Sequence, residues 1–200
     1  MTSGLKMHRV EWRAALAANL LALASLPALA FELPDLMAQL AQRQSGEARF
    51  TEQRFVTGLD QTLRSSGTLS FKAPERLARH TLAPRPESFV VEGNQITLER
   101  GGRVRQASLD TVPEMGALVA AIRGTLTGNA AVLRQHFKAN VGGNAAHWTL
   151  TLLPLDERLG GTVRELRLEG QQADLLRVEV QLSDGDRSVM NIEPVASAAP

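Results

Sequence analysis

Side chains capable of catalysis or metal binding occur in this sequence, but not at catalytic spacings. There is no G-x-S-x-G nucleophile turn, and His80, His136 and His147 lie too far apart for a local zinc motif such as H-E-x-x-H. Each histidine is more simply a surface or packing residue, although a ligand set assembled in space stays open. We therefore expect no catalytic residue, no metal and no cofactor, and a protein that is not an enzyme.

The acidic and glycine-rich segments are better explained as turns than as ligand sites. Asp184-Gly185-Asp186 resembles part of a calcium loop but lacks the other oxygen ligands and the terminal Glu of that loop. The glycine pairs at 101–102, 142–143 and 160–161 do not have the spacing of phosphate-binding loops. Cysteine is absent, which excludes disulfides, thiolate nucleophiles and sulfur-ligated metals.

Residues 1–30 are typical of a cleavable signal peptide. Three basic residues precede an apolar stretch over 14–26, and residues 27–30 provide small side chains for a signal peptidase. The apolar stretch is shorter than the roughly 20 residues that a membrane-spanning helix needs. We expect a cleaved signal peptide and a soluble, unanchored periplasmic protein, with an uncleaved membrane anchor as the alternative.

The composition after the signal peptide fits one domain over residues 31–195, with a disordered tail at 196–200. The full chain has 22 Lys and Arg against 21 Asp and Glu, and without residues 1–30 these become 19 and 20. A net charge near −1 argues against nucleic acid as a partner. Trp148 is the only Trp after residue 30 and Tyr is absent, which argues against an aromatic stacking platform.

The hydrophobic periodicity predicts a long antiparallel sheet with helices at its start and in its middle. Apolar residues recur at helical spacing over 31–44 and 113–125, and Asn129 can cap a further helix that ends at His136. Alternating segments separated by turns predict strands. These strands cover residues 48–55, 67–72, 75–81, 88–92, 95–100, 104–109, 147–153, 163–169, 175–182 and 187–193. The helices must bury their apolar faces, and the inner face of a curled sheet is the available place.

Four segments in this order resemble the periplasmic lipoprotein carrier family, the LolA-like proteins. Residues 48–55 resemble the family's first strand, of F-x-Q character, and residues 69–74 match its L-x-x-K-x-P segment. Residues 88–95 resemble its apolar hairpin, and residues 148–154 resemble a later strand that leads into a proline. The likeness is colinear over Phe31–Pro194.

The resemblance implies a mainly β (α+β) fold: a single unclosed antiparallel β-barrel, or half-barrel, with helices covering its concave face, as in LolA and LolB. It also implies a hydrophobic cavity that takes the acyl chains of a lipoprotein released from the inner membrane. The implied partners are an acylated lipid or lipoprotein cargo, an inner-membrane donor transporter and an outer-membrane acceptor. The carrier itself is expected to be a monomer.

The sequence departs from the family pattern at the expected lid contact. Ala73 stands where typical carriers have an arginine that tethers the helical lid, and aromatic residues of the family are replaced by Leu77, Arg79, Ile96 and Leu98. We therefore interpret the chain as a divergent branch, whose cargo is a lipoprotein or another acylated lipid.

The leading hypothesis is a non-enzymatic carrier that shields acyl chains between the inner and outer membranes. The alternatives are a lipid- or protein-sensing scaffold of the same fold and an enzyme on lipid-linked substrates, which the missing motifs disfavour. The candidate cavity-lining residues are apolar side chains from the predicted helices and strands, each of which has core packing as its competing explanation. They are Met37, Leu40, Phe50, Leu69, Phe71, Phe89, Val91, Ile96, Leu98, Met115, Leu118, Ile122 and Trp148.

Overall fold

Alternating polar and apolar strands form one antiparallel sheet in the computed structural model, which describes residues 30–195. The predicted signal peptide and C-terminal tail lie outside the described residues, apart from Ala30, so those boundaries stay predictions. The eleven strands are β1 (Ser45–Phe55), β2 (Leu63–Lys72), β3 (Arg76–Ala83), β4 (Glu87–Glu92), β5 (Gln95–Arg100), β6 (Arg103–Ser108), β7 (Phe137–Gly143), β8 (Trp148–Pro154), β9 (Val163–Gln171), β10 (Asp174–Leu182) and β11 (Arg187–Pro194).

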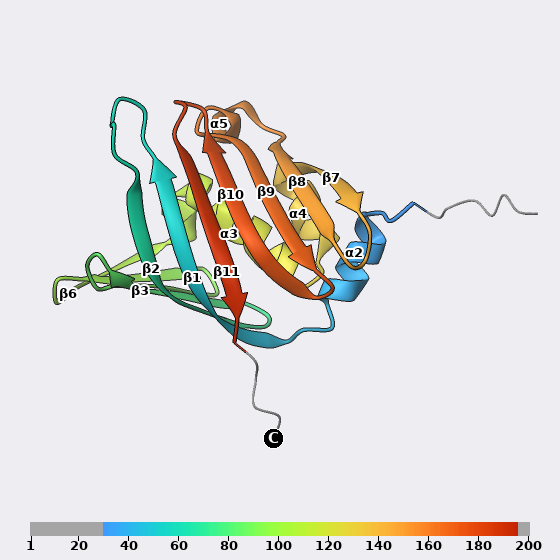
Figure 1. Ribbon diagram of the computed structural model, residues 1–200, viewed down its shortest axis with the longest axis horizontal. Coiled ribbons are helices and arrows are strands. Elements are labelled where there is room, and N and C mark those ends of the chain that lie inside the picture. Colours follow the sequence, from blue (N-terminus) through green and yellow to red (C-terminus); the bar gives the residue numbers. More distant parts are fainter. Residues whose placement is uncertain (1–29, 196–200) are drawn as a thin grey trace, which may run out of the picture. The chain divides into compact units, whose positions relative to one another are not determined.

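The strand order is β6-β5-β4-β3-β2-β1-β11-β10-β9-β8-β7, so the first and last strands of the chain pair at the centre of the sheet. Strands β6 and β7 form the two edges, and no pairing joins them within the described residues. In Figure 1, β3–β6 run across the direction of β1, β11 and β10, which shows how strongly the sheet curls. The predicted unclosed antiparallel half-barrel is confirmed.

The helices of the described region lie against one face of this sheet, the face turned away from the viewer in Figure 1. They are α2 (Leu33–Leu40), α3 (Pro113–Leu126), α4 (Ala130–His136) and α5 (Glu157–Gly160), with a short 3-10 helix, η1 (Leu109–Thr111). As predicted, Asn129 caps α4, its side chain accepting a hydrogen bond from the Val132 amide at 3.2 Å. None of the helices within residues 30–195 is long and apolar enough to cross a membrane.

Strand β7 and helix α5 were not predicted from the sequence. Strand β7 follows α4 directly, and its inward-facing series of Phe137, Ala139 and Val141 is too short and mixed in size to mark a strand. Helix α5 lies within the predicted turn at 154–161, where the Asp156 side chain accepts from the Leu159 amide and caps one helical turn. Strand β2 begins at Leu63, earlier than the predicted residue 67. Residues 63–66 are mostly polar, so the sequence did not mark them as part of the strand.

The buried apolar residues form two separate clusters on the concave face. The larger cluster joins α2, α4 and part of α3 to β7–β11, and Trp148 and Phe137 are among its largest fully buried side chains. The smaller cluster contains Val91, Ile96, Leu109 and Val119, with Leu77 and Phe89 packed beside it. Helix α3 contributes to both clusters, so it bridges the two halves of the curled sheet.

Gly170 on β9 contacts the larger cluster, so a substitution at this position measures how closely that cluster is packed. A Cβ at this position would overlap the Trp148 ring and the Asp174 carbonyl oxygen, so we expect Gly170→Ala to lower the free energy of unfolding by roughly 1–3 kcal/mol. The measurement is urea denaturation. Gly142→Ala is the matched control, since a Cβ there would meet open space. Equal stability of the two variants would contradict this account of the packing.

Candidate functional site

A cavity of about 450 Å³ lies on the concave face between the two core clusters. This volume falls within the roughly 300–1,000 Å³ that is typical of small-molecule sites. Most of its lining is apolar, and its walls come from α3, from β1–β4 and from β10 and β11. The lining residues are Arg43, Gly46, Glu47, Ala48, Leu69, Ser70, Phe71, Leu77, Ala78, Arg79, Glu87, Phe89, Met115, Leu118, Val119, Ile122, Leu126, Ala173, Asp174, Leu175, Val178, Met190, Ile192 and Pro194.

Helix α3 covers the cavity because it is apolar on more than one side. Its Ala117 and Ala121 pack into the larger cluster and its Val119 into the smaller one. A third stripe, Met115, Leu118, Ile122 and Leu126, follows the three- and four-residue spacing of one helix face and lines the cavity. The two clusters therefore hold the helix in place. Leu118, Ile122 and Leu126 also border the larger cluster, and the stripe as a whole presents an apolar surface to the cavity.

Charged residues border the apolar wall. Arg43, which follows α2, forms an ion pair with Asp174 at 2.5 Å where β10 begins. Both residues belong to the cavity lining, together with Glu47 on β1. Arg79 and Glu87 provide the charges on the β3–β4 side. Polar groups thus lie at the margins of the cavity, and the side chains between them are aliphatic or aromatic.

Glu52 is a buried carboxylate on the concave face of β1, 8% exposed, and it is fully engaged. It accepts hydrogen bonds from the Ser188 hydroxyl at 2.6 Å, the Ser65 hydroxyl at 2.9 Å and the Arg79 guanidinium at 2.5 Å. The Arg79 guanidinium also lies over the Phe50 ring, 4.7 Å from its centre. Burial alone raises the pKa of Glu52, but these hydrogen bonds and the charge of Arg79 outweigh it, so the pKa lies below its ordinary value.

The hydrogen bond that ties α3 to the β4–β5 hairpin comes from the helix. Arg123 donates from its guanidinium to the Gly93 carbonyl oxygen at 2.7 Å, across the turn that joins β4 to β5. Burial lowers the pKa of Arg123, and the nearby Glu75 carboxylate opposes that shift. Ala73, at the position of the family's arginine, donates only its backbone amide, to the Gln44 carbonyl oxygen at 2.8 Å. The side-chain hydrogen bond between α3 and this hairpin is therefore supplied by Arg123.

Six of the thirteen candidate lining residues lie on the cavity wall. The three from strands are Leu69, Phe71 and Phe89, and the three from the covering helix are Met115, Leu118 and Ile122. Their contact with a ligand stays a prediction.

The other seven candidates lie away from the cavity wall, most of them as core residues. Met37, Leu40 and Trp148 pack into the larger cluster, Val91 and Ile96 form the smaller one, and Phe50 lies beneath Arg79. Leu98 is half-buried on β5, opposite Phe89. The physical reason is that α2, α4 and α3 fill most of the concave face, which leaves a ligand only the space between the clusters.

The wall residues from the C-terminal strands were not predicted from the sequence. Val178, Met190 and Ile192 face the cavity because β11 pairs with β1 and β10 pairs with β11. The alternation in both segments predicts that these residues face inward. Their place beside Ala48 and Leu69 depends on a pairing between distant parts of the chain, which periodicity does not reveal.

Residues 30–195 contain no group of three or more His, Cys, Asp or Glu side chains arranged to hold a metal ion. The fold and the site together define a class of protein in which a curled antiparallel sheet and a covering helix enclose an apolar cavity. A profile of the family described as outer membrane lipoprotein carrier protein LolA-like matches residues 25–199. The chain belongs to this family, as its resemblance predicted.

Comparison with curated proteins finds no match. Among solved structures, the chain is similar to a LolA superfamily protein from Nitrosomonas europaea, with 10% identity and a TM-score of 0.45, covering 84% of this chain and 93% of that chain. It is also similar to a chain of the Pseudomonas aeruginosa MucA/MucB complex, with 16% identity, a TM-score of 0.45 and coverage of 84% and 58%. The lipoprotein LppX of Mycobacterium tuberculosis has 10% identity, a TM-score of 0.41 and coverage of 83% and 98%.

The lowered pKa of Glu52 predicts acid sensitivity with a definite sign. Its ionised form stabilises the fold above the ordinary carboxyl pKa, and this stabilisation is lost as the pH falls through the lower pKa of the folded state. We expect Glu52→Gln to flatten the fall in unfolding free energy between about pH 5 and pH 3. At neutral pH the variant should be roughly 1–3 kcal/mol less stable, because Arg79 loses its anionic partner.

The measurement is urea denaturation at a series of pH values. Glu169→Gln is the control, since Glu169 forms an exposed pair with Arg167 on the opposite face of the sheet, and it should change stability by less than about 0.5 kcal/mol. Parallel pH profiles of wild type and Glu52→Gln would show that the Glu52 network does not govern acid stability.

Removal of the Arg123 side chain should loosen the covering helix. We expect Arg123→Met to increase amide hydrogen exchange over residues 113–126 relative to β9, because the hydrogen bond to Gly93 is lost while the apolar stem is retained. Arg134→Met, an exposed change on α4, is the control. Exchange rates in α3 that match the wild-type rates would mean that the two core clusters alone hold the helix.

Proposed function

We propose that this protein is a non-enzymatic carrier that shields the acyl chains of a lipoprotein or another lipidated cargo. The observation that carries the proposal is the apolar cavity between the two core clusters, with the apolar stripe of α3 as one wall and β1–β4, β10 and β11 as the others. Membership of the LolA-like family supports the same function.

The energetics of acyl-chain burial suit such a role. Removing one CH₂ group from water contributes about 0.8 kcal/mol, so about 12 methylenes gain roughly 10 kcal/mol relative to water. A bilayer offers nearly the same gain, so a carrier must bind its cargo about as well as the membrane that it leaves. Met115 and Met190 line the cavity, and their unbranched, flexible side chains allow binding that tolerates variation in shape.

In this proposal the carrier works in the periplasm. It would receive its cargo from an inner-membrane donor and deliver it to an outer-membrane acceptor, as the family description of an outer membrane lipoprotein carrier suggests. The predicted signal peptide over residues 1–30 would direct its export. The competing possibility is a scaffold or sensor that uses the same half-barrel to bind a protein and transfers no lipid.

A charged side chain in the cavity wall should abolish acyl-chain binding. We expect Leu69→Glu to weaken binding of a fluorescent fatty acid at least about tenfold, because a carboxylate in an apolar site must lose its hydration. The matched control is Thr68→Glu, at the adjacent position on β2, where the side chain is exposed on the opposite face of the sheet. Circular dichroism checks that both variants are folded.

Wild-type binding by a folded Leu69→Glu variant would place the lipid elsewhere. Mass spectrometry of extracted lipid gives an independent measure, and near one-to-one acyl lipid in the wild type is the expected result. Absence of lipid, together with a stable complex with a protein, would favour the scaffold over the carrier.

A further inference from the structure

We propose that the concave face of β4–β6 binds an anionic headgroup of the lipid whose acyl chain occupies the cavity. The inference rests on the proposed function and deepens it, because it specifies the chemical class of the cargo as an acyl lipid with a phosphate or carboxylate group. The binding groups are Arg100, Arg103 and Arg105, which we call the arginine cluster.

The strand register places the arginine cluster on the same face as the cavity wall. Residues directly opposite each other on paired strands point to the same side of a sheet. Glu87 lies opposite Arg100, which lies opposite Arg103. Phe89 lies opposite Leu98, which lies opposite Arg105.

This register makes one continuous surface that passes from apolar to basic. Phe89 and Glu87 line the cavity, and the half-buried Leu98 separates Phe89 from Arg105. Two strand spacings of about 4.8 Å put the Arg105 backbone about 10 Å from that of Phe89. An acyl chain in the cavity would therefore bring the first polar groups of its lipid within reach of the long arginine side chains.

The charged side chains of β4–β6 are divided unequally between the two faces of the sheet. All three arginines share the concave face with a single carboxylate, Glu87, while Glu92 and Glu99 point to the opposite face. Arg100 and Glu87 approach to only 3.5 Å, and both side chains retain solvent exposure. Arg103 and Arg105 form no ion pair with any residue of the described region. The concave face thus holds excess guanidinium groups, which suit phosphate or carboxylate oxygens.

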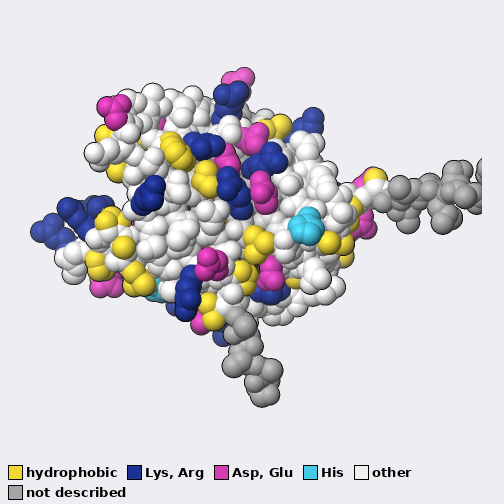
Figure 2. All heavy atoms as spheres, in the orientation of Figure 1, with side chains coloured by type: hydrophobic (Ala, Val, Ile, Leu, Met, Phe, Trp, Pro, Cys, Tyr) yellow, Lys and Arg dark blue, Asp and Glu magenta, His cyan; other side chains and the backbone are white. Residues whose placement is uncertain are grey.

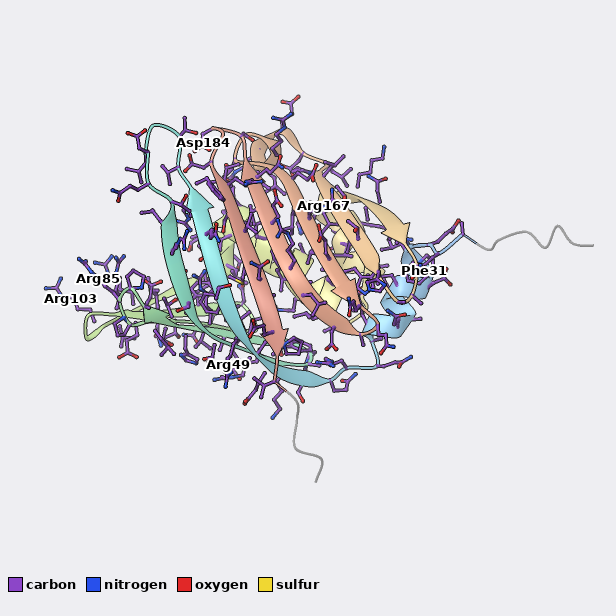
Figure 3. All side chains as sticks on the ribbon, in the orientation of Figure 1. Phe31, Arg49, Arg85, Arg103, Arg167 and Asp184 are labelled. Carbon is purple, nitrogen blue, oxygen red and sulfur yellow. The ribbon has the colours of Figure 1, made fainter. Side chains whose placement is uncertain are left out.

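Basic side chains gather at the end of the sheet where β6 lies (Figure 1 and Figure 2). Figure 2 has a group of dark-blue side chains at the left end of the view, where Figure 3 labels Arg85 of the β3–β4 loop and Arg103. Over β9–β11, by contrast, most arginines are paired with carboxylates: Arg167 with Glu169, and both Arg177 and Arg187 with Glu179. Positive charge is therefore left uncompensated beside the cavity.

The edge position of β6 offers a competing explanation for Arg103 and Arg105. Charged residues on an edge strand prevent its pairing with another chain. Under that explanation, reversal of their charge would alter self-association and leave the choice of ligand unchanged.

The test compares two lipids that share one acyl chain and differ in headgroup charge. Protein produced from the full-length chain is loaded with a neutral hydrophobic dye, and lysophosphatidylglycerol or lysophosphatidylcholine displaces it. We expect the wild type to bind the anionic lipid about tenfold more tightly at low salt, with the preference shrinking at high salt. Arg103→Glu/Arg105→Glu should lose this preference. Arg49→Glu/Arg167→Glu, an equal charge reversal on the opposite face of the sheet, should keep it.

The other possible outcomes would each reject the headgroup site, and they differ in what they imply for the carrier function. Equal binding of both lipids by the wild type would overturn the headgroup site and leave the carrier function intact. Loss of the preference in both double variants would overturn it too, by assigning the preference to net charge. Displacement by neither lipid would reject the carrier function as well. A double variant of β6 that changes only its oligomeric state would assign the arginines to edge protection.

Discussion

The packing of α3 against two separate core clusters is the contact on which the rest of the molecule depends. A helix that buried all of its apolar surface in one core would close over the sheet and leave no space. Here Ala117 and Ala121 are buried in one cluster and Val119 in the other. Met115, Leu118 and Ile122 line the cavity between them, the last two at the border of the larger cluster. The cavity exists because the curled sheet is wider than the cores that can be built on it, and because one helix is held at both sides.

Polar interactions around the cavity have a different structural role from the two apolar core clusters. Arg123 fixes α3 to the turn at Gly93, and the network around Glu52 satisfies a carboxylate and a guanidinium that would otherwise be costly to bury. Both use arginine, whose guanidinium keeps its charge and donates several hydrogen bonds at once. The apolar wall can therefore stay free of polar groups, while charged groups define where the cavity ends.

Local patterns in the sequence predicted most of the fold, but only six of the 24 residues that line the cavity. The hairpin at Gly93 and Asn94, the helix from Pro113 and the cap at Asn129 all follow from short-range chemistry, and the structure has each of them. Strand β7 was not predicted because its inward-facing residues lack a clear pattern. The division of apolar residues between core and cavity could not be predicted for another reason. Trp148 and Met190 are both apolar, and only the order of the strands decides which of them faces the cavity.

The pairing of β1 with β11 has a consequence for folding. Phe50 lies opposite Ile192 at the centre of the sheet, so the two ends of the domain must meet before either central strand has both neighbours. A large sequence separation between contacting residues is associated with slow folding. A chain that stopped before Arg187 would leave β1 and β10 each with a bare hydrogen-bonding edge, and such edges invite aggregation. Strand β11 is therefore the element that joins the β1–β6 part of the sheet to the β7–β10 part.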